Sequence, residues 1–366
     1  MKNLYQVMLF GLLMGSAGCA QSTPAELRTP EGFVIETLNF AVPNARQMAL
    51  TKAGNLIVGT RRRGAVYAVI DPLGPSPEVR VLFDAGLKMP SGITVDNNDL
   101  YIGAVSTIIK VPNIDANLRK DPGHEVITDR LPTEGHHGWK YLKFGPDNML
   151  YVPVGAPCNI CLEQDPRFAS LLRMDPKTGD TEVWASGIRN TVGFAWHPQT
   201  QDLWFTDNGR DMLGDDVPPE ELNRVQTPGQ HFGYPFIHAD GIKDPEFGSH
   251  NAAADTAFTA PELEIQAHSA ALGMAYNTEE QFPAAYKDAL FIAEHGSWNR
   301  SKKVGYRVVT VTEASDGSLQ YAPFVEGWLT DEAVSGRPND VLFAPDGSLL
   351  ISDDDNGVIY RVSYPG

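Results

Sequence analysis

Short polar segments along the chain carry residue types that bind anionic ligands and transfer protons. They combine His, Arg, Asp and Asn with Gly, and each adjoins a run of apolar residues. The segments are TRRRG from Thr60, EGHHGWK from Glu134, SGIRNTVG from Ser186, TDNGRDMLGDDVPPEELN from Thr206, AEHGSWNR from Ala293 and SGRPNDV from Ser335. Loops held by a rigid scaffold commonly carry functional residues, so these segments are the first candidates for a site.

His136 and His137 are the candidates for proton transfer. Imidazole titrates near neutral pH, which suits either a general base or a metal ligand. The alternative is a pair of loop side chains that bond to the backbone. Other segments supply Arg189, His295 and Arg337 at corresponding positions, and this favours a functional site. The spacing alone does not decide between His136 and His137.

Arg residues stand out in a chain whose formal net charge is −17. Arg61 to Arg63, Arg189 with its neighbour Asn190, and Arg337 lie in three different polar segments. The guanidinium group is a rigid fork of donors that matches carboxylate and carbonyl oxygens, so converging Arg side chains indicate an anionic ligand. The alternative is a set of ion pairs with acidic residues at the surface.

The stretch from Asp207 to Asn223 is rich in oxygen donors. Calcium takes six to eight oxygen ligands in flexible geometry, and the Gly and Pro residues of this stretch force turns that expose backbone carbonyls. The acidic residues are Asp207, Asp211, Asp215, Asp216, Glu220 and Glu221. Their spacing does not fit the helix-loop-helix calcium motif, and a solvated acidic loop is an equally good interpretation.

Repeated hairpins are the elements that must position these segments. In each, Asp, Asn, Gly or Pro forms a turn between two apolar stretches that favour strands. The six copies are MALTKAGNLIVG from Met48, ITVDNNDLYIGA from Ile93, LKFGPDNMLYVPVG from Leu142, FAWHPQTQDLWFTDNG from Phe194, MAYNTEEQFPAAYKDALFIAEHG from Met274 and VLFAPDGSLLISDDDNG from Val341. Such copies at intervals of roughly 45 to 80 residues are typical of β-propellers. The sequence therefore predicts an all-β, six-bladed β-propeller.

The 366 residues are predicted to form one propeller domain, over residues 33–366, preceded by an export segment. Residues 1–18 have one Lys and an apolar run from Val7 to Met14, which is typical of a signal peptide. Cys19 follows small residues, as in bacterial lipoproteins, so we expect a lipid anchor and a periplasmic or outer-membrane location, with plain secretion as the alternative. Residues 19–32 are polar and are predicted to be a tether.

The charge balance limits the partners of the protein. The chain has 46 Asp and Glu residues against 29 Lys and Arg, and a strongly acidic surface repels phosphate backbones. We therefore expect no nucleic-acid partner, and membrane association through the lipid anchor at most.

Cys158 and Cys161 are the remaining Cys residues, in the segment APCNIC. In an exported protein a close pair usually forms a disulfide. A second pair that would complete a zinc site is absent from the sequence, and the pair follows an expected strand, whereas redox motifs open a helix. A small structural disulfide is the favoured interpretation.

Several reaction classes lack their motifs in the sequence. The glycine-rich phosphate loop, the nucleotide-binding Gly-x-Gly-x-x-Gly, the His-Glu-x-x-His zinc motif and the Gly-x-Ser-x-Gly nucleophile turn are all missing. Any chemistry must depend on His, Arg and a metal or cofactor.

The ordered set of segments resembles the soluble quinoprotein sugar dehydrogenase family, in particular its sorbosone dehydrogenase-like branch. The segments are HHGWKYLKFGPD, SGIRN, DNGRD followed by PPEELN, HFGYP, EHGSWNR and GRPNDV. Members of that family are six-bladed propellers that use pyrroloquinoline quinone and calcium. The resemblance covers nearly the whole mature chain.

The resemblance implies roles for individual residues. His137, counted back from the Phe-Gly-Pro-Asp turn, would be the general base and also contact the quinone. Arg189, Asn190 and Arg337 would hold the cofactor, and Arg61 and His295 are further expected contacts. For calcium, the matching positions are the backbone carbonyls of Gly209 and Arg210 and the side chain of Glu220, with Asp216 as a competing ligand.

The implied activity is the oxidation of a sugar or sugar aldehyde, with electrons passed to an unidentified acceptor. The chain has His295 where glucose-oxidising members have Lys, has Asn339 where they have a second Arg, and is shorter than they are. These departures disfavour glucose as the substrate. Two alternatives remain open. A metal-dependent sugar lactonase would need Glu, Asn, Asn and Asp from four blades, and a non-enzymatic binding propeller would display its loops to a partner protein.

Overall fold

The computed structural model describes residues 26–254 and 256–366. The predicted signal segment, Cys19 and the start of the predicted tether lie outside these residues. In the described part the chain is almost entirely β-structure, with a single α-helical turn, α1 (Asn251–Ala254), and two 3-10 turns, η1 (Ile114–Ala116) and η2 (Ala284–Tyr286). None of the helices there is long and apolar enough to cross a membrane.

The first three blades are four-stranded antiparallel sheets whose strands follow chain order. Blade 1 consists of β2 (Ala45–Leu50), β3 (Leu56–Thr60), β4 (Val66–Ile70) and β5 (Glu78–Phe83). Blade 2 consists of β6 (Gly92–Asp96), β7 (Asp99–Gly103), β8 (Ile108–Val111) and β9 (Glu125–Thr128). Blade 3 consists of β10 (Lys143–Phe144), β11 (Leu150–Val154), β12 (Ser170–Met174) and β13 (Thr181–Ser186).

The other three blades are also four-stranded, but blade 4 carries an insertion before its last strand and blade 6 takes its outermost strand from the N-terminal part of the chain. Blade 4 consists of β14 (Phe194–Trp196), β15 (Leu203–Asp207), β16 (Glu220–Val225) and β19 (Leu263–Ile265). Blade 5 consists of β20 (Ala271–Tyr276), β21 (Leu290–Glu294), β22 (Arg307–Glu313) and β23 (Leu319–Val325). Blade 6 consists of β26 (Pro338–Phe343), β27 (Leu349–Asp353), β28 (Val358–Ser363) and β1 (Val34–Thr37). Two separate hairpins pair β17 (Ile237–His238) with β18 (Ile242–Lys243), and β24 (Leu329–Thr330) with β25 (Ala333–Val334).

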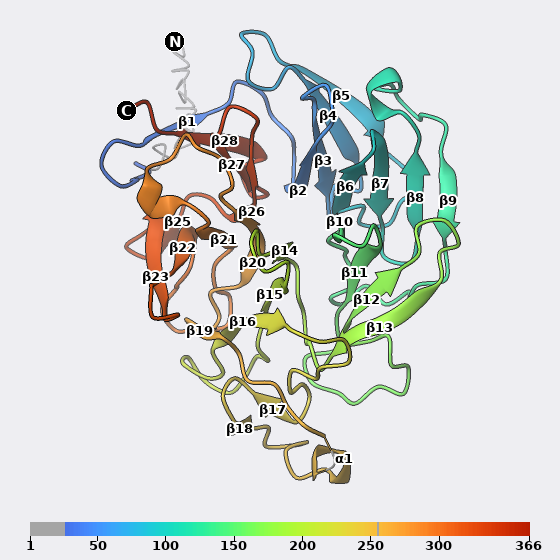
Figure 1. The fold of residues 1–366 in the computed structure, drawn as a ribbon, viewed down its shortest axis with the longest axis vertical. Helices are drawn as coiled ribbons and strands as arrows, with labels where there is room; N and C mark the ends of the chain where they lie inside the picture. The colour runs from blue at the N-terminus through green and yellow to red at the C-terminus, as the bar shows by residue number, and fades with distance from the viewer. Residues whose placement is uncertain (1–25, 255) are drawn as a thin grey trace, which may run out of the picture.

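The blades succeed one another around a ring in chain order, with the first strand of each blade toward the middle (Figure 1). The six predicted hairpin copies are the first and second strands of the six blades. Blade 4 carries a projecting insertion between β16 and β19, which holds β17, β18 and α1 (Figure 1). The structure confirms the prediction of an all-β, six-bladed propeller.

The N-terminal strand closes the ring. β1 supplies the outermost strand of blade 6 and pairs antiparallel with β28, so the two ends of the chain share one sheet. Just before β1, Arg28 forms a bridge with Glu326, with an N to O distance of 2.7 Å. Part of the predicted tether therefore packs on blade 5, because its backbone finds hydrogen-bond partners there.

Each interface between neighbouring blades has its own apolar core. Successive side chains of a strand point to opposite faces, so a strand packed on both sides is apolar throughout. In β3, Leu56 and Val58 pack against blade 6, whereas Ile57 packs against blade 2. This double burial explains why the second strands carry continuous runs of buried residues.

The strand order brings two kinds of loop to one end of the ring. In a four-stranded antiparallel blade, the loop from the second to the third strand and the connection from the fourth strand to the next blade lie at the same end. The expected polar segments occupy these two kinds of loop. Register shifts at the start of β2, β20 and β26 lie beside this end. Such bulges redirect side chains next to active sites.

Candidate functional site

A cavity of about 430 Å³ lies where these loops converge. Its walls are strongly polar and include five Arg and four His side chains. The lining residues are Arg46, Arg61, Arg62, His136, His137, Trp139, Arg189, Asn190, Asn208, Gly209, Asp211, Glu220, His268, Ala270, Leu272, His295, Gly296, Trp298 and Arg337. The structure thus brings together the predicted cofactor residues from five segments of the sequence.

His137 is the buried imidazole of the cavity wall. It lies in the connection from blade 2 to blade 3, and its Nδ1 is 2.9 Å from the carbonyl oxygen of Ala156. Because a carbonyl only accepts hydrogen bonds, Nδ1 must carry the proton, and Nε2 is left as the basic nitrogen. Burial, the positive charge of Arg189 and the neighbouring His136 hold the pKa of His137 well below its usual value. The side chain is therefore neutral at neutral pH, with the lone pair of Nε2 available.

Local backbone geometry fixes the place of His137. The residue has a φ of 48°, in the left-handed region. Gly155 lies directly behind it, and a Cβ atom at Gly155 would lie 2.5 Å from the Cβ of His137. A side chain at position 155 would displace the imidazole. His136, in contrast, is exposed at the edge of the cavity.

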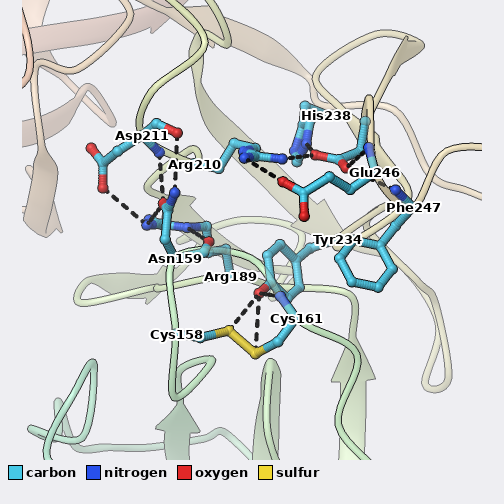
Figure 2. A network of polar contacts seen from close by, with 11 residues as sticks. Cys158, Asn159, Cys161, Arg189, Arg210, Asp211, Tyr234, His238, Glu246 and Phe247 are labelled. Atoms are coloured by element: carbon cyan, nitrogen blue, oxygen red, sulfur yellow. Dashed lines mark hydrogen bonds and ion pairs between the residues drawn. A yellow bond between two sulfur atoms is a disulfide. The ribbon is translucent and has the colours of Figure 1, made fainter.

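Arg189 enters the cavity from the connection between blades 3 and 4, and it is only 4% exposed. Its guanidinium group donates to the carbonyl oxygens of Asn159 (2.8 Å) and Asn208 (3.0 Å) and lies 3.2 Å from a carboxylate oxygen of Asp211 (Figure 2). Neutral carbonyls provide most of its acceptors, so its positive charge is only partly compensated. This arrangement favours a negatively charged ligand in the cavity.

Asp207 fixes the backbone that presents Arg189 and Asn190. Its two carboxylate oxygens accept hydrogen bonds from the backbone N–H groups of Arg189 (2.8 Å) and Asn190 (2.6 Å). Burial and the nearby carboxylate of Glu221 raise the pKa of Asp207. The predicted acidic stretch is therefore partly structural, because Asp207 and Glu221 each bond to loop backbone.

His295 and Arg337 belong to a second charged network around Asp354. The carboxylate of Asp354 lies 2.7 Å from Nε2 of His295 and 2.7 Å from the guanidinium group of Arg46. Arg337 donates to the backbone carbonyl oxygens of His295 (3.1 Å) and Gly296 (2.9 Å). Burial lowers the pKa of His295, so its neutral ring donates to the ionised Asp354. One carboxylate thus orients two ligand-facing side chains.

Arg61 and Arg62 form the uncompensated side of the cavity. The guanidinium carbon of Arg61 lies 3.6 Å from the centre of the Trp139 ring, which is a cation–π contact. Within residues 26–254 and 256–366, neither Arg61 nor Arg62 makes a side-chain hydrogen bond or an ion pair. Burial and the charges of Arg46 and Arg62 lower the pKa of Arg61 to about 10, and it stays protonated at neutral pH.

The predicted metal ligands separate into two groups. Glu220 is buried and lines the cavity beside Gly209, whose N–H donates to its carboxylate at 3.0 Å. Burial raises the pKa of Glu220 to about 8. The Arg210 side chain points to Asp244, at 2.5 Å, and only its backbone is available to the site. Asp216 does not line the cavity; its carboxylate is 85% exposed and pairs with Arg300.

Clusters of three or more His, Cys, Asp or Glu side chains arranged to hold a metal do not occur in the part of the chain that the structure describes. A metal at Glu220 would therefore depend on backbone carbonyl oxygens, which is a ligand type that calcium accepts.

Several lining residues were not expected from the sequence. Arg46 lines the cavity from the bulged start of β2, just before the first hairpin copy, and its ion-pair partner Asp354 lies near the end of the last copy, in the segment SDDDNG. That segment matches the TDNG ending of the fourth copy, which was a signal for a site residue. Asn208, His268 and Trp298 line the cavity as well, and Trp298 is 69% exposed.

The predicted disulfide is present. Cys158 and Cys161 are bonded, with their Cα atoms 6.2 Å apart, in the loop between β11 and β12. This loop lies against Arg189 (Figure 2).

Comparisons with known proteins match nearly the whole of the described chain. The model of the TrAA12-like family matches residues 27–364. An uncharacterized protein of Borreliella burgdorferi is 33% identical over 360 residues, which cover 94% of this chain and 93% of that protein. A pyrroloquinoline quinone-dependent sugar dehydrogenase of Hypocrea jecorina is 23% identical over 426 residues, covering 96% of this chain and 94% of the relative.

A solved structure has the same fold. It is the holo form of the pyrroloquinoline quinone domain of a pyranose dehydrogenase from Coprinopsis cinerea, with a TM-score of 0.76 and 18% identity. The match covers 93% of this chain and 97% of that chain.

Proposed function

The chain belongs to the TrAA12-like family, and we propose that it is a quinoprotein dehydrogenase that oxidises a sugar or sugar aldehyde with pyrroloquinoline quinone as its cofactor. The observation that carries this proposal is one cavity that joins a buried neutral imidazole, His137, to five Arg side chains. A base and an excess of positive charge are what a hydride transfer to an anionic quinone requires of the protein.

The lining residues fit such a cofactor. The buried Nε of Arg46 lacks a partner, and the half-buried Arg61 and the exposed Arg62 have guanidinium groups without acceptors among the described residues. A buried donor without an acceptor is costly, and the carboxylates of the cofactor would supply acceptors. Trp139 presents an aromatic face beside Arg61, which suits a planar ring system.

His137 would act as the general base. Its Nε2 would take the proton of the hydroxyl on the carbon being oxidised, while Nδ1 keeps its bond to the carbonyl of Ala156. That second bond prevents the ring from turning and fixes the tautomer. The quinone, when bound, supplies the acceptor for the hydride. Arg189 and Arg337 would orient the bound anion and stabilise its charge.

Calcium would be held by Glu220 together with backbone carbonyl oxygens of Gly209 and Arg210. Glu220 forms no ion pair within the described residues, and burial raises its pKa even though the charge of Arg189 acts in the opposite direction, so its ionised form is disfavoured. A divalent cation would compensate it. The calcium site rests on this argument and on the resemblance of the sequence segments.

The lactonase alternative has less support from the cavity. It would require acidic and amide side chains from four blades, but here Asn190, Asn208, Asp211 and Glu220 all come from residues 190–220. The numerous Arg side chains would also have no role in that reaction.

The proposal extends to the substrate of the enzyme, its location in the cell and its electron acceptor. The substitution of His295 and Asn339 for the basic residues of glucose-oxidising enzymes supports a sorbosone-like preference. The disulfide supports export to an oxidising compartment, where Cys19 would carry a lipid anchor and an unidentified acceptor would take the electrons.

A binding titration tests the proposed function. The apo protein is titrated with pyrroloquinoline quinone and calcium while its tryptophan fluorescence is followed, because two of its six Trp residues, Trp139 and Trp298, line the cavity. We expect saturable quenching, and an affinity at least about tenfold lower in Arg189→Ala, because a charged hydrogen-bonding group is lost. Arg224→Ala is the matched control, since Arg224 pairs with Asp202 in blade 4 and does not line the cavity. A parent protein that binds no quinone would refute the proposal.

A further inference from the structure

The four-residue loop closed by the Cys158–Cys161 disulfide, here called the disulfide loop, lies directly beside the cavity. It is part of the connection between the second and third strands of blade 3. The sequence suggested only a local structural bridge. In the structure, the loop inserts a single polar side chain, Asn159, between Arg189 and Asp211 (Figure 2).

Asn159 makes contacts with two cavity residues at once. Its backbone carbonyl accepts from Nε of Arg189 at 2.8 Å, and its side-chain oxygen accepts from Nη2 of Arg189 at 2.8 Å. The same side-chain oxygen accepts from the backbone N–H of Asp211 at 2.8 Å, and the Asn159 amide donates to the Asp211 carbonyl at 3.1 Å. Asn159 therefore holds Arg189 and also the loop that carries the carboxylate partner of Arg189.

The loop itself is fixed from behind. The disulfide ties its two ends together, and the hydroxyl of Tyr234 accepts from the backbone N–H of Cys161 at 2.9 Å and lies 3.4 Å from the sulfur of Cys158. Tyr234 comes from the projecting insertion of blade 4. Two covalently joined ends and a hydrogen bond from another blade limit the positions that Asn159 adopts.

We infer that the disulfide loop is a positioning element for the anion-binding face of the cavity, with Asn159 as the residue that aims Arg189 at the ligand. If the loop were not held in this place, the guanidinium group would keep its charge but lose both acceptors that Asn159 supplies. If only the Asn159 side chain were lost, Nη2 would lose its acceptor and the Asp211 backbone would lose both of its bonds to Asn159. The geometric part of this inference stands on the protein alone, and its effect on cofactor affinity rests on the proposed function.

The first test measures Arg189 in the protein without cofactor. Phenylglyoxal modifies accessible guanidinium groups, and mass spectrometry gives the rate at each Arg. We expect Arg189 to react several-fold faster in Asn159→Ala and in the double variant Cys158→Ser/Cys161→Ser than in the parent, because the first removes the side-chain acceptor of Nη2 and the second releases the loop that carries both Asn159 acceptors. Arg224 serves as the internal reference whose rate stays constant.

A matched variant tests whether the loss of an Asn side chain elsewhere in the fold also raises the reactivity of Arg189. Asn117 also donates from its side chain to two backbone carbonyls, of Pro112 at 2.8 Å and Asn113 at 3.1 Å, but in a loop of blade 2 that does not line the cavity. Asn117→Ala should leave the Arg189 rate unchanged. Tyr234→Phe, which removes one hydroxyl and keeps the disulfide, should give an intermediate rate and serves if the double Ser variant does not fold.

The second test measures the affinity for pyrroloquinoline quinone with calcium. Asn159→Ala should raise Kd about tenfold, with a melting temperature no lower than that of Asn117→Ala. Parent-like Arg189 reactivity in Asn159→Ala and Tyr234→Phe would overturn the inference, as would an unchanged Kd in a parent that binds the quinone. If the parent does not bind, the proposed function fails, and the reactivity of Arg189 alone decides the inference.

Discussion

At the scale of residues, His137 and His136 are neighbours with opposite environments. His137 is buried and bonded through Nδ1 to a carbonyl, whereas His136 is exposed at the cavity edge. Their spacing in the sequence could not separate them, because the difference depends on Gly155 and Ala156, which lie just after β11 and meet His137 only in the folded blade. The resemblance to known sequences pointed to His137, and the structure supplies a physical reason for that choice.

Replacing His137 should remove the base while leaving the ligand cavity in place. We expect His137→Ala to lower kcat for sugar oxidation by at least about a hundredfold. The affinity for the quinone should change little, because the Arg side chains remain. His136→Ala is the control, and its kcat should fall less than that of His137→Ala. Near-parental turnover by His137→Ala would remove His137 from the mechanism.

Glu220 should make the stability of the apo protein depend on pH. A carboxyl whose pKa is raised by folding stabilises the protein at low pH, and this contribution is lost as the pH rises through the folded value, here about 8. The pKa values of Asp207 and Glu221 are also raised, so these carboxyl groups likewise lower the stability of the folded protein as the pH rises. The pKa of His137 is lowered, so this residue has the opposite effect and raises the stability as the pH rises. Its effect is confined to the range below about pH 6.5, the pKa of a free imidazole.

The melting temperature of the apo protein is therefore expected to fall between about pH 6.5 and pH 8 and to level off at higher pH, where these carboxyl groups are ionised in both the folded and the unfolded state. Glu220→Gln should flatten this fall, because the amide has no proton to lose. Calcium should raise the melting temperature of the parent more at the alkaline end than at the neutral end. An equal slope in parent and Glu220→Gln, with no calcium effect, would argue against a metal at this position.

At the scale of elements, the hairpins were predictable and the closing strand was not. The first two strands of each blade are local in sequence, with a turn between them, so their pattern is visible in a short window. β1 pairs with β28 from the opposite end of the chain, and no local pattern specifies such a partner. Arg46 and Asp354 escaped notice for a similar reason, since they meet only when the ring closes.

Phe33 fastens the closing strand to the ring. Its ring lies 4.8 Å from that of Phe282 and 5.0 Å from those of Phe324 and Tyr364, between blades 5 and 6. Phe33→Ala should destabilise the protein by about 3 kcal/mol, as for other buried aromatic residues. Val34→Ala, at a side chain that is 51% exposed, is the control and should have little effect. Chemical denaturation of both variants measures the difference, and equal stabilities would show that closure does not depend on Phe33.

At the scale of the whole molecule, the ring combines an acidic exterior with a basic cavity. The formal net charge is −17, yet five Arg side chains line one cavity. The sequence predicted this contrast, because the Arg-containing segments recur at comparable places in the repeats. The sequence did not predict which guanidinium groups have hydrogen-bond acceptors among the residues of the protein and which lack them. Arg189 is held by Asn159, which comes from the β11–β12 loop of blade 3, and Arg61 lies in contact with Trp139.

The most direct test of the account is to reconstitute the apo protein with pyrroloquinoline quinone and calcium and to assay dye reduction with aldoses, sugar aldehydes and sugar lactones. The account predicts sugar-dependent dye reduction that requires the quinone and is lost in His137→Ala. Lactone hydrolysis without dye reduction, or no turnover by a protein that binds no quinone, would contradict it.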